Sequence, residues 1–252
     1  MRSKILIVLL FSLWGGLAQE SRLFDDATTA YNEGDYEKAI DNYLKILESG
    51  QHSSELYYNL GNSYYKINKI APSIYYFEKA LLLAPHDPEI NTNLGYAQNM
   101  TIDVIEKLPE TAMRKFYTQV TGWLTFDQWA YTAVFFVVFF VMAYIVFYYL
   151  RYATQKRVAF ITSLACALAA VVAVVLAYLR HTDFKNENPA IVFAEEVVIT
   201  SEPNERSEEV FTLHEGTKVN IVEELNNWQR IQIADGKTGW LPKDSIKALK
   251  DF

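Results

Sequence analysis

Two uncharged apolar runs decide the architecture of this chain: Tyr131–Leu150 reads YTAVFFVVFFVMAYIVFYYL, and Val158–Leu179 reads VAFITSLACALAAVVAVVLAYL. A helix needs about 20 predominantly apolar residues to cross a bilayer, and each run has that length. Two buried core helices of a soluble protein are the alternative, but neither run has a polar face that could point to water. The runs therefore predict a pair of transmembrane helices, over residues 129–150 and 158–180.

The charge between the two runs predicts their orientation. The connecting segment, residues 151–157, holds Arg151, Lys156 and Arg157 and no acidic residue. Short basic loops stay in the cytoplasm, so both flanks of the hairpin are expected on the other side of the membrane.

The N-terminus agrees with this orientation. Arg2 and Lys4 precede the apolar stretch Ile5–Leu13, and small residues follow at Gly15, Gly16 and Ala18. This order is typical of a secretory signal peptide, which we expect over residues 1–19. An uncleaved anchor is the alternative and has the same topology. The sequence thus predicts a protein of the bacterial inner membrane, with a cytoplasmic loop and periplasmic soluble parts.

Both soluble parts are acidic. Residues 20–107 contain 14 Asp and Glu against 7 Lys and Arg, and residues 187–251 contain 13 against 7. A negative surface argues against nucleic acid as a partner and against electrostatic docking of these parts onto anionic lipid. The single cysteine, Cys166, lies inside the second apolar run, so the soluble parts contain no internal disulfide.

The part before the hairpin repeats with an offset of 34 residues. Gly34–Tyr43 aligns with Asn68–Phe77, and the same offset takes Ala27 to Gly61 and Gly95. Small residues at these positions allow paired helices to approach closely, and aromatic residues fill the remaining space. A period of 34 with these residue types resembles the tetratricopeptide repeat. We expect an all-α solenoid over residues 20–100, with full repeats at 20–51 and 54–87 and a third that begins at Pro88 and fades after Met100.

The resemblance to tetratricopeptide repeats implies a concave groove that binds a segment of a partner protein. The first helix of each pair lines such a groove, and the matching positions here are Phe24, Thr28, Tyr31, Tyr58, Asn62, Tyr65, Lys66, Thr92 and Tyr96. Repeats that bind a C-terminal carboxylate have a basic residue where Phe24 stands, which argues against that mode. Tyrosine and asparagine indicate a neutral or mixed partner segment.

A connector over residues 101–128 joins the repeats to the first span. Pro109 interrupts it, and residues at near-helical spacing follow: Met113, Phe116, Val120, Trp123 and Leu124. The pattern fits either an amphipathic helix on the membrane surface or a plain linker helix. In the first case, Trp123 and Trp129 would belong to an interfacial aromatic belt.

After a linker at residues 181–189, the hydrophobic period changes to two over residues 190–249. Asn226-Asn227 and Asp235-Gly236 predict tight turns between short strands, which indicates a small all-β barrel. The order Leu213-x-x-Gly216-x-x-Val219, Trp228 and Gly239-Trp240-Leu241 resembles bacterial SH3 domains. That resemblance implies binding of cell-wall peptides or of other proteins. Trp228 and Trp240 belong either to the core or to a binding rim.

Catalytic and metal-binding patterns are absent from the sequence. His52, His86, His181 and His214 do not have the spacing of metal ligands, and neither a phosphate-binding loop nor a nucleophile elbow occurs. Neither apolar run contains a charge, which argues against an ion pathway. We therefore expect a protein that is not an enzyme and that has no cofactor and no metal.

The complete order of parts is a tetratricopeptide solenoid, a transmembrane hairpin and an SH3-like barrel in one multidomain membrane protein. This order is similar to that of the BatE proteins of Bacteroides aerotolerance operons. The similarity implies membrane proteins with von Willebrand A domains and sibling tetratricopeptide proteins as partners, with a MoxR-type ATPase in the cytoplasm. A scaffold for an envelope complex linked to oxygen or stress tolerance is the leading hypothesis. The alternative is an envelope sensor that binds peptidoglycan.

Overall fold

A computed structural model describes residues 22–106 and 108–250 of the chain. They form two compact units: the first joins residues 22–106 to residues 188–250, and the second comprises residues 108–187. The repeats and the C-terminal strands thus belong to one unit, although the hairpin separates them in sequence. The signal peptide predicted at residues 1–19 lies outside the described residues.

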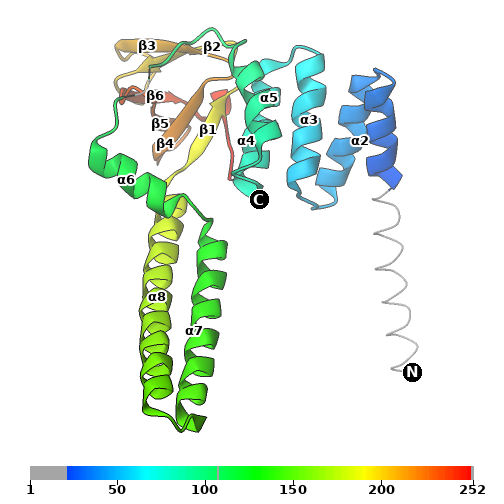
Figure 1. Cartoon of the computed structure of the whole chain (residues 1–252). Coiled ribbons are helices and arrows are strands. Elements are labelled where there is room, and N and C mark those ends of the chain that lie inside the picture. Colours follow the sequence, from blue (N-terminus) through cyan, green and yellow to red (C-terminus); the bar gives the residue numbers. More distant parts are fainter. Residues whose placement is uncertain (1–21, 107, 251–252) are drawn as a thin grey trace, which may run out of the picture. The chain divides into compact units, whose positions relative to one another are not determined.

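The repeats of the first unit are antiparallel helices laid side by side (Figure 1). They comprise residues 22–32, α2 (Tyr36–Glu48), α3 (Ser54–Lys66), α4 (Ile70–Leu83) and α5 (Pro88–Gln98). Asp35, Ser53 and Asp87 cap the starts of α2, α3 and α5 by accepting hydrogen bonds from backbone N–H groups. These bounds agree with two full repeats and the start of a third at Pro88.

The backbone conformation repeats with the same period of 34 residues as the sequence. Gly34 and Asn68, which are 34 residues apart, both have a left-handed conformation, with φ of 85° and 59°. Each lies in the turn between the helices of a pair, where glycine and asparagine adopt this conformation most readily.

The predicted close approach of helices occurs at Gly61. A Cβ atom there would lie 2.6 Å from the ring of Phe77 on the next helix. The buried Ser73 hydroxyl donates a hydrogen bond of 2.9 Å to the carbonyl of Gly61. At Gly95, by contrast, a Cβ atom would meet nothing within 4 Å among the described residues, so only the earlier members of the series are packed in this way.

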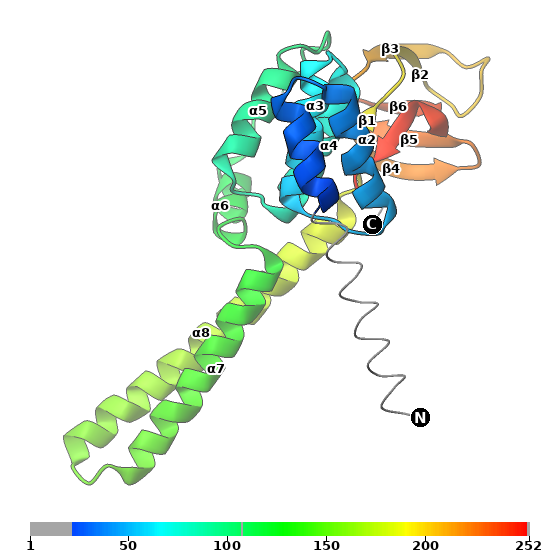
Figure 2. The same ribbon diagram turned by 90° about the vertical axis from the view of Figure 1, so that its right-hand side faces the viewer.

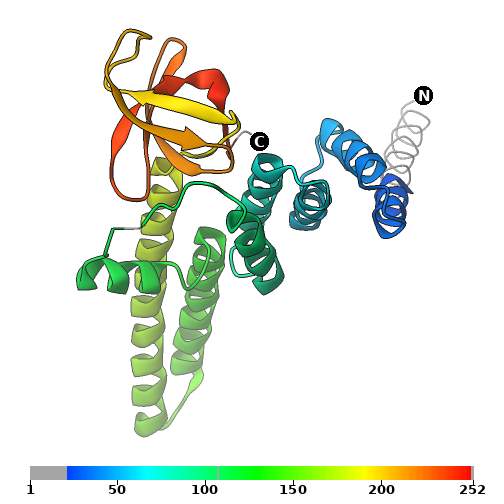
Figure 3. The same cartoon turned by 90° about the horizontal axis from the view of Figure 1, so that it is seen from above.

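Seven short strands form the C-terminal sheet: β1 (Pro189–Val192), β2 (Glu196–Thr200), β3 (Glu209–His214), β4 (Lys218–Leu225), β5 (Trp228–Gln232), β6 (Thr238–Pro242) and β7 (Ile246–Ala248). Figure 3 shows these curved strands in yellow to red, and neighbouring strands pair antiparallel. The predicted turns are confirmed, because Asn226 and Gly236 have φ of 54° and 89° between paired strands. The strand order is β3-β2-β6-β5-β4-β1-β7.

The small barrel expected from the sequence is not closed among the strands that the structure describes. They form an open sheet whose edges, β3 and β7, do not pair with each other. The edge near β1 and β7 instead packs on the repeats, since Ile191 and Leu249 are fully buried in one cluster with Ile74 and Phe77. Side chains of the repeat helices thus bury apolar residues at this edge of the sheet. In a closed barrel, pairing of the edge strands would bury them instead.

The second unit contains α6 (Ala112–Thr121), α7 (Phe126–Tyr149) and α8 (Ala153–Asn186). Figure 2 shows α7 and α8 side by side as an antiparallel hairpin. Both are long and apolar enough to cross a membrane. The connection between them is shorter than expected, because α8 already begins at Ala153. Lys156 and Arg157 therefore lie in the first turns of a helix, and most of the linker at residues 181–189 is helical too.

Trp129 does not belong to an interfacial aromatic belt. Its side chain is only 8% exposed and packs between Ala133 and Ala173, and its indole N–H donates a 3.1 Å hydrogen bond to the carbonyl of Thr121. It therefore holds the hairpin helices together. Trp123 has the opposite environment, at 75% exposed, and remains suited to a membrane–water boundary.

Helix α6 carries exposed apolar side chains, among them Met113 and Phe116. The hydroxyl of Tyr117 attaches it to α8 by donating a 2.7 Å hydrogen bond to Asp183. This bond favours the protonated phenol and so raises the pKa of Tyr117. Both hypotheses for the connector, a surface helix and a plain linker, are compatible with this arrangement.

Candidate functional site

A polar network joins the first helices of the second and third repeats. The side-chain amide of Asn93 on α5 donates hydrogen bonds of 2.9 Å to the hydroxyl of Tyr58 and 2.8 Å to Oδ1 of Asn62, both on α3. Tyr58 and Asn62 were predicted as groove residues, and the network places them on one surface. Its atoms are neutral donors and acceptors, which suit the N–H and C=O groups of an extended peptide.

Asn93 was missing from the predicted groove. It stands 34 residues after Asn59, whose side chain bonds the hydroxyl of Tyr43. The two asparagines thus occupy equivalent positions of successive repeats, and each bonds a tyrosine of the preceding repeat. The sequence repeat already indicated Asn93, because the 34-residue offset that takes Gly61 to Gly95 also takes Asn59 to Asn93.

The first repeat supplies the aromatic end of this surface. The ring of Phe24 packs edge-on against Tyr43 with 5.5 Å between centroids, and the hydroxyl of Thr28 lies 3.0 Å from that of Tyr43. Burial raises the pKa of Tyr43 more than its hydrogen bonds to Thr28 and Asn59 lower it. The phenol therefore stays protonated at neutral pH and contributes no charge.

Tyr31 links the first repeat to the second. Burial raises its pKa, and the neighbouring phenols of Tyr36, Tyr58 and Tyr43 add to the shift. Its ring also packs edge-on against Tyr36, with 5.3 Å between centroids. Tyr31 thus belongs to a group of neighbouring tyrosines from the first two repeats.

The remaining predicted groove residues differ in exposure. Tyr65 is half-buried against the repeat core, whereas Lys66, Thr92 and Tyr96 are exposed. The hydroxyl of Thr92 is used locally, since it donates 2.7 Å to the carbonyl of Pro88. Tyr96 and Lys66 are thus the members best able to contact a partner with their side-chain ends.

A separate hollow of about 380 Å³ lies between α2 and α4, lined by Leu44, Leu47, Glu48, His52, Tyr57, Tyr75, Tyr76 and Lys79. Lys79 is only 5% exposed, and its ammonium group lies 5.1 Å from the ring centroids of both Tyr57 and Tyr75. It also donates 3.2 Å to the Tyr75 hydroxyl. Cation–π contacts compensate part of the cost of burying this charge.

The repeats are joined to the sheet by Asp103, a residue to which the sequence assigned no role. Its carboxylate accepts hydrogen bonds from the backbone N–H and ring Nδ1 of His214, both at 2.7 Å, and from the Thr217 hydroxyl at 2.6 Å. Burial raises the pKa of this carboxyl. The bonds from Thr217 and His214 and the charge of His214 lower it further than burial raises it, so the net shift is downward.

Three further contacts complete this joint. Lys218 on β4 pairs with the buried carboxylate of Glu78 on α4 at 2.6 Å. The ring of Phe193 packs edge-on against Tyr75 with 5.5 Å between centroids. Gly216 fits closely, because a Cβ atom there would lie 2.9 Å from Thr101 and 3.0 Å from Ile74. Repeats and sheet therefore meet through packed apolar surface as well as through charges.

The two tryptophans predicted for the SH3-like rim have different environments. Trp240 is 8% exposed within β6, where its neighbours across the sheet are Arg230 and Thr200. Trp228 starts β5 and is half-buried, next to the turn at Asn226-Asn227. Trp228 therefore has more ring surface available to a ligand than Trp240.

Comparison with known families identifies two modules. The family model of the tetratricopeptide repeat matches residues 54–87, which are the bounds predicted for the second repeat. The bacterial SH3 domain model matches residues 199–247, within the predicted range of 190–249. No protein of curated function matches the chain. Among residues 22–106 and 108–250, no three His, Cys, Asp or Glu side chains are grouped to hold a metal ion. The chain thus combines modules of protein–protein or cell-wall interaction with two helices able to cross a membrane.

Proposed function

We propose that this chain is a non-enzymatic scaffold that is anchored in the bacterial inner membrane and assembles an envelope protein complex. The observation that carries the proposal is the neutral surface of Tyr58, Asn62 and Asn93, which belongs to the same compact unit as the SH3-like sheet. Two recognition modules in one unit can hold two partner segments at a defined separation.

The groove recognises an extended, largely uncharged segment of a partner protein. Amide and hydroxyl groups at the floor of the groove bind the partner backbone, and Tyr96 and Lys66 contact its side chains. Each module alone would bind weakly. Because both are carried by one chain, the second contact is intramolecular and gains affinity through effective concentration.

The hairpin tethers the scaffold, with both soluble modules in the periplasm. Support comes from Arg151, Lys156 and Arg157 at the tip of the hairpin, which favour a cytoplasmic tip. The partner set comes from the similarity of domain order to BatE proteins. It consists of membrane proteins with von Willebrand A domains and sibling tetratricopeptide proteins, in a role linked to aerotolerance or stress.

The test is a mild-detergent pull-down of the tagged full-length protein from its own membranes, with bound proteins identified by mass spectrometry. The variant is Asn62→Ala with Asn93→Ala, which removes the polar network. The matched control is Asn42→Ala, an asparagine of α2 that bonds only its neighbour Lys45 among the contacts described for it. We expect stoichiometric recovery of a membrane partner with wild type and control, and its loss with the double variant. Equal recovery with all three proteins would rule out the groove as the binding site.

A second candidate function is a sensor that binds peptidoglycan through the SH3-like sheet. It is favoured by the match to bacterial SH3 domains and by the accessible ring of Trp228. Cosedimentation of the full-length protein with isolated cell-wall sacculi distinguishes the two functions. The sensor predicts binding that Trp228→Ala abolishes and that Trp123→Ala, at an exposed tryptophan outside the sheet, leaves intact. No cosedimentation of the wild type would leave the scaffold as the sole candidate.

A further inference from the structure

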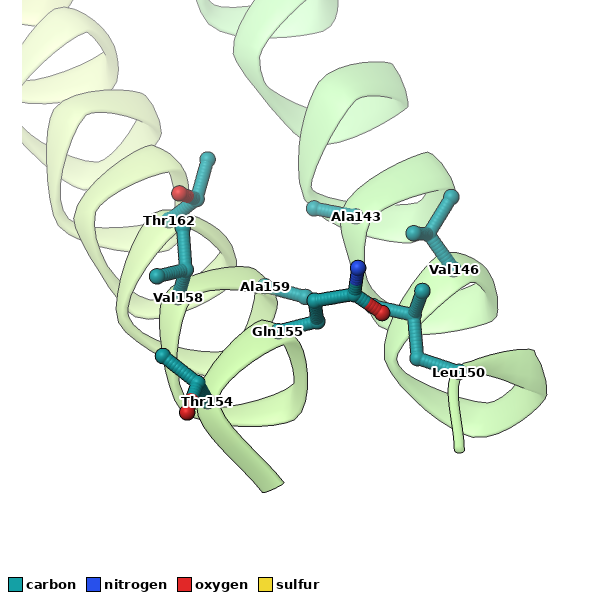
Figure 4. Close-up of a pocket in the computed structure, with 8 residues that line it drawn as sticks. All are labelled: Ala143, Val146, Leu150, Thr154, Gln155, Val158, Ala159 and Thr162. Atoms are coloured by element: carbon teal, nitrogen blue, oxygen red, sulfur yellow. The ribbon is translucent and has the colours of Figure 1, made fainter. Parts of the chain in front are cut away.

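A groove of about 490 Å³ lies between α7 and α8 near the tip of the hairpin. Figure 4 shows its lining, in which Ala143, Val146 and Leu150 come from α7 and Thr154, Gln155, Val158, Ala159 and Thr162 from α8. Most of the lining is apolar. The side chains of Thr154, Thr162 and Gln155 add polar atoms, and Gln155 extends from α8 toward α7.

The groove exists because small side chains face each other at this end of the hairpin. Ala143 and Ala159 contribute one methyl group each, so the space between the helices is left open. At the opposite end, the indole of Trp129 fills the corresponding space against Ala133 and Ala173. The hairpin is therefore tightly packed at one end and open at the other.

Three basic residues lie close in sequence to the residues that line this groove. Arg151 directly follows the lining residue Leu150, and Lys156 and Arg157 directly follow Gln155. Arg151 and Arg157 are exposed, and the Lys156 ammonium lies 5.6 Å from the ring centroid of Phe147. No Asp or Glu occurs between Asp127 and Asp183, so the hairpin segment that carries these charges contains no acidic residue.

We propose that this groove binds an anionic phospholipid, with an acyl chain between the helices and the phosphate at the basic segment of residues 151–157. Charge complementarity selects this occupant. An apolar groove beside uncompensated positive charge matches a molecule with an apolar chain and an anionic head. A third apolar helix would fill the groove but would leave the charges without a partner. The Thr154 hydroxyl and Gln155 amide can donate to the oxygens of the lipid head. The inference rests on the proposed membrane anchoring.

The test is native mass spectrometry of the purified full-length protein after exposure to phosphatidylglycerol or to phosphatidylcholine with identical acyl chains. A basic residue near an anionic surface contributes about fivefold in affinity. We therefore expect several-fold more phosphatidylglycerol to be retained. The triple variant Arg151→Gln, Lys156→Gln and Arg157→Gln should lose this preference. Arg180→Gln with Lys185→Gln, which removes charges from the other end of α8, should keep it.

A second variant tests the groove independently of the charges. Ala143→Leu fills the space and keeps all three basic residues, so it should reduce the retention of both lipids while the helical circular dichroism stays that of wild type. Equal retention of the two lipids by the wild type, or an unchanged preference in the triple variant, would overturn the proposal. Stoichiometric disulfide dimers of Thr162→Cys in a Cys166→Ala background would also overturn it, because a second copy would then cover the groove.

A separate experiment tests whether the protein is anchored in the membrane. If alkaline carbonate releases the protein from its membranes, the anchoring and the proposed scaffold function fail together with the lipid site. If the protein stays in the membrane and the lipid preference is absent, only the lipid site fails.

Discussion

Asp103 and His214 are hydrogen-bonded to each other twice, through the backbone N–H and the ring Nδ1 of the histidine, at 2.7 Å each. They stand 111 residues apart in sequence, with the whole α7–α8 hairpin between them. Asp103 follows the last repeat helix, and His214 ends β3. The bonds therefore connect the tetratricopeptide repeats to the SH3-like sheet. The two modules therefore belong to one compact unit.

Replacing Asp103 by asparagine should loosen this joint. The amide keeps the shape but loses the charge and presents N–H groups to donors, so we expect a local loss of about 1.5–3 kcal/mol. Hydrogen exchange in the full-length protein should then accelerate in residues 101–106 and in β3 together. Asp244→Asn, at an exposed aspartate in the 3₁₀ turn between β6 and β7, is the control and should leave both segments protected. Acceleration in only one segment would contradict a joint that opens as a unit.

The same carboxylate predicts how the joint responds to acid. Its pKa lies below the ordinary value of 3.8, so the folded state favours the ionised form. Its contribution is then fully present above the unfolded pKa and is lost as pH falls through the lower folded pKa. From pH 7 to 5, exchange protection at the joint should not change through Asp103, whereas below about pH 4 it should fall. The Asp103→Asn variant should lack this acid-dependent step. A step of the same size in the variant would assign it to another group.

Gly216 should tolerate no side chain, for two separable reasons. Its φ of 84° costs an L-residue about 1–2 kcal/mol, and its Cβ would also press on Thr101 and Ile74. Gly50 has the same φ, at 85°, but a Cβ there meets nothing within 4 Å among the described residues. Gly50→Ala thus measures the backbone strain alone, and Gly216→Ala should destabilise the protein more in thermal unfolding. Equal destabilisation by Gly50→Ala and Gly216→Ala would mean that the contacts around Gly216 adjust to the added methyl group without an energetic cost.

The close contact of α3 and α4 makes Gly61 sensitive to a single methyl group. A Cβ atom at Gly61 would overlap the ring of Phe77, so Gly61→Ala should destabilise the repeats by about 1–3 kcal/mol. The matched control is Gly95→Ala, at the equivalent position of α5, where the added methyl group meets open space. Alanine favours the helix over glycine, so this control should stabilise α5 by up to about 1 kcal/mol. Denaturant unfolding of both variants measures the difference, and the same sign for both would refute the packing argument.

Local patterns in the sequence predicted much of this protein. The apolar runs predict α7 and α8 because about 20 uncharged apolar residues make a helix that is long and apolar enough to cross a bilayer. The 34-residue period predicts the repeats because each pair of helices must bury the same positions against its neighbours. Asn226 and Asp235-Gly236 mark turns because few residues adopt positive φ cheaply.

The tertiary structure alone decided the features that depend on contacts between distant residues. The burial of Trp129 follows from Ala173 on the facing helix, and the open edge of the sheet follows from repeat helices that cover Ile191 and Leu249. The hydrogen bonds between Asp103 and His214 cannot be predicted from any periodic pattern in the sequence. In an acidic chain, Asp103 looks like any other solvent-exposed aspartate. Periodicity reports which face of an element is buried. It does not report which surface buries that face, and for this protein that surface is what joins the two recognition modules.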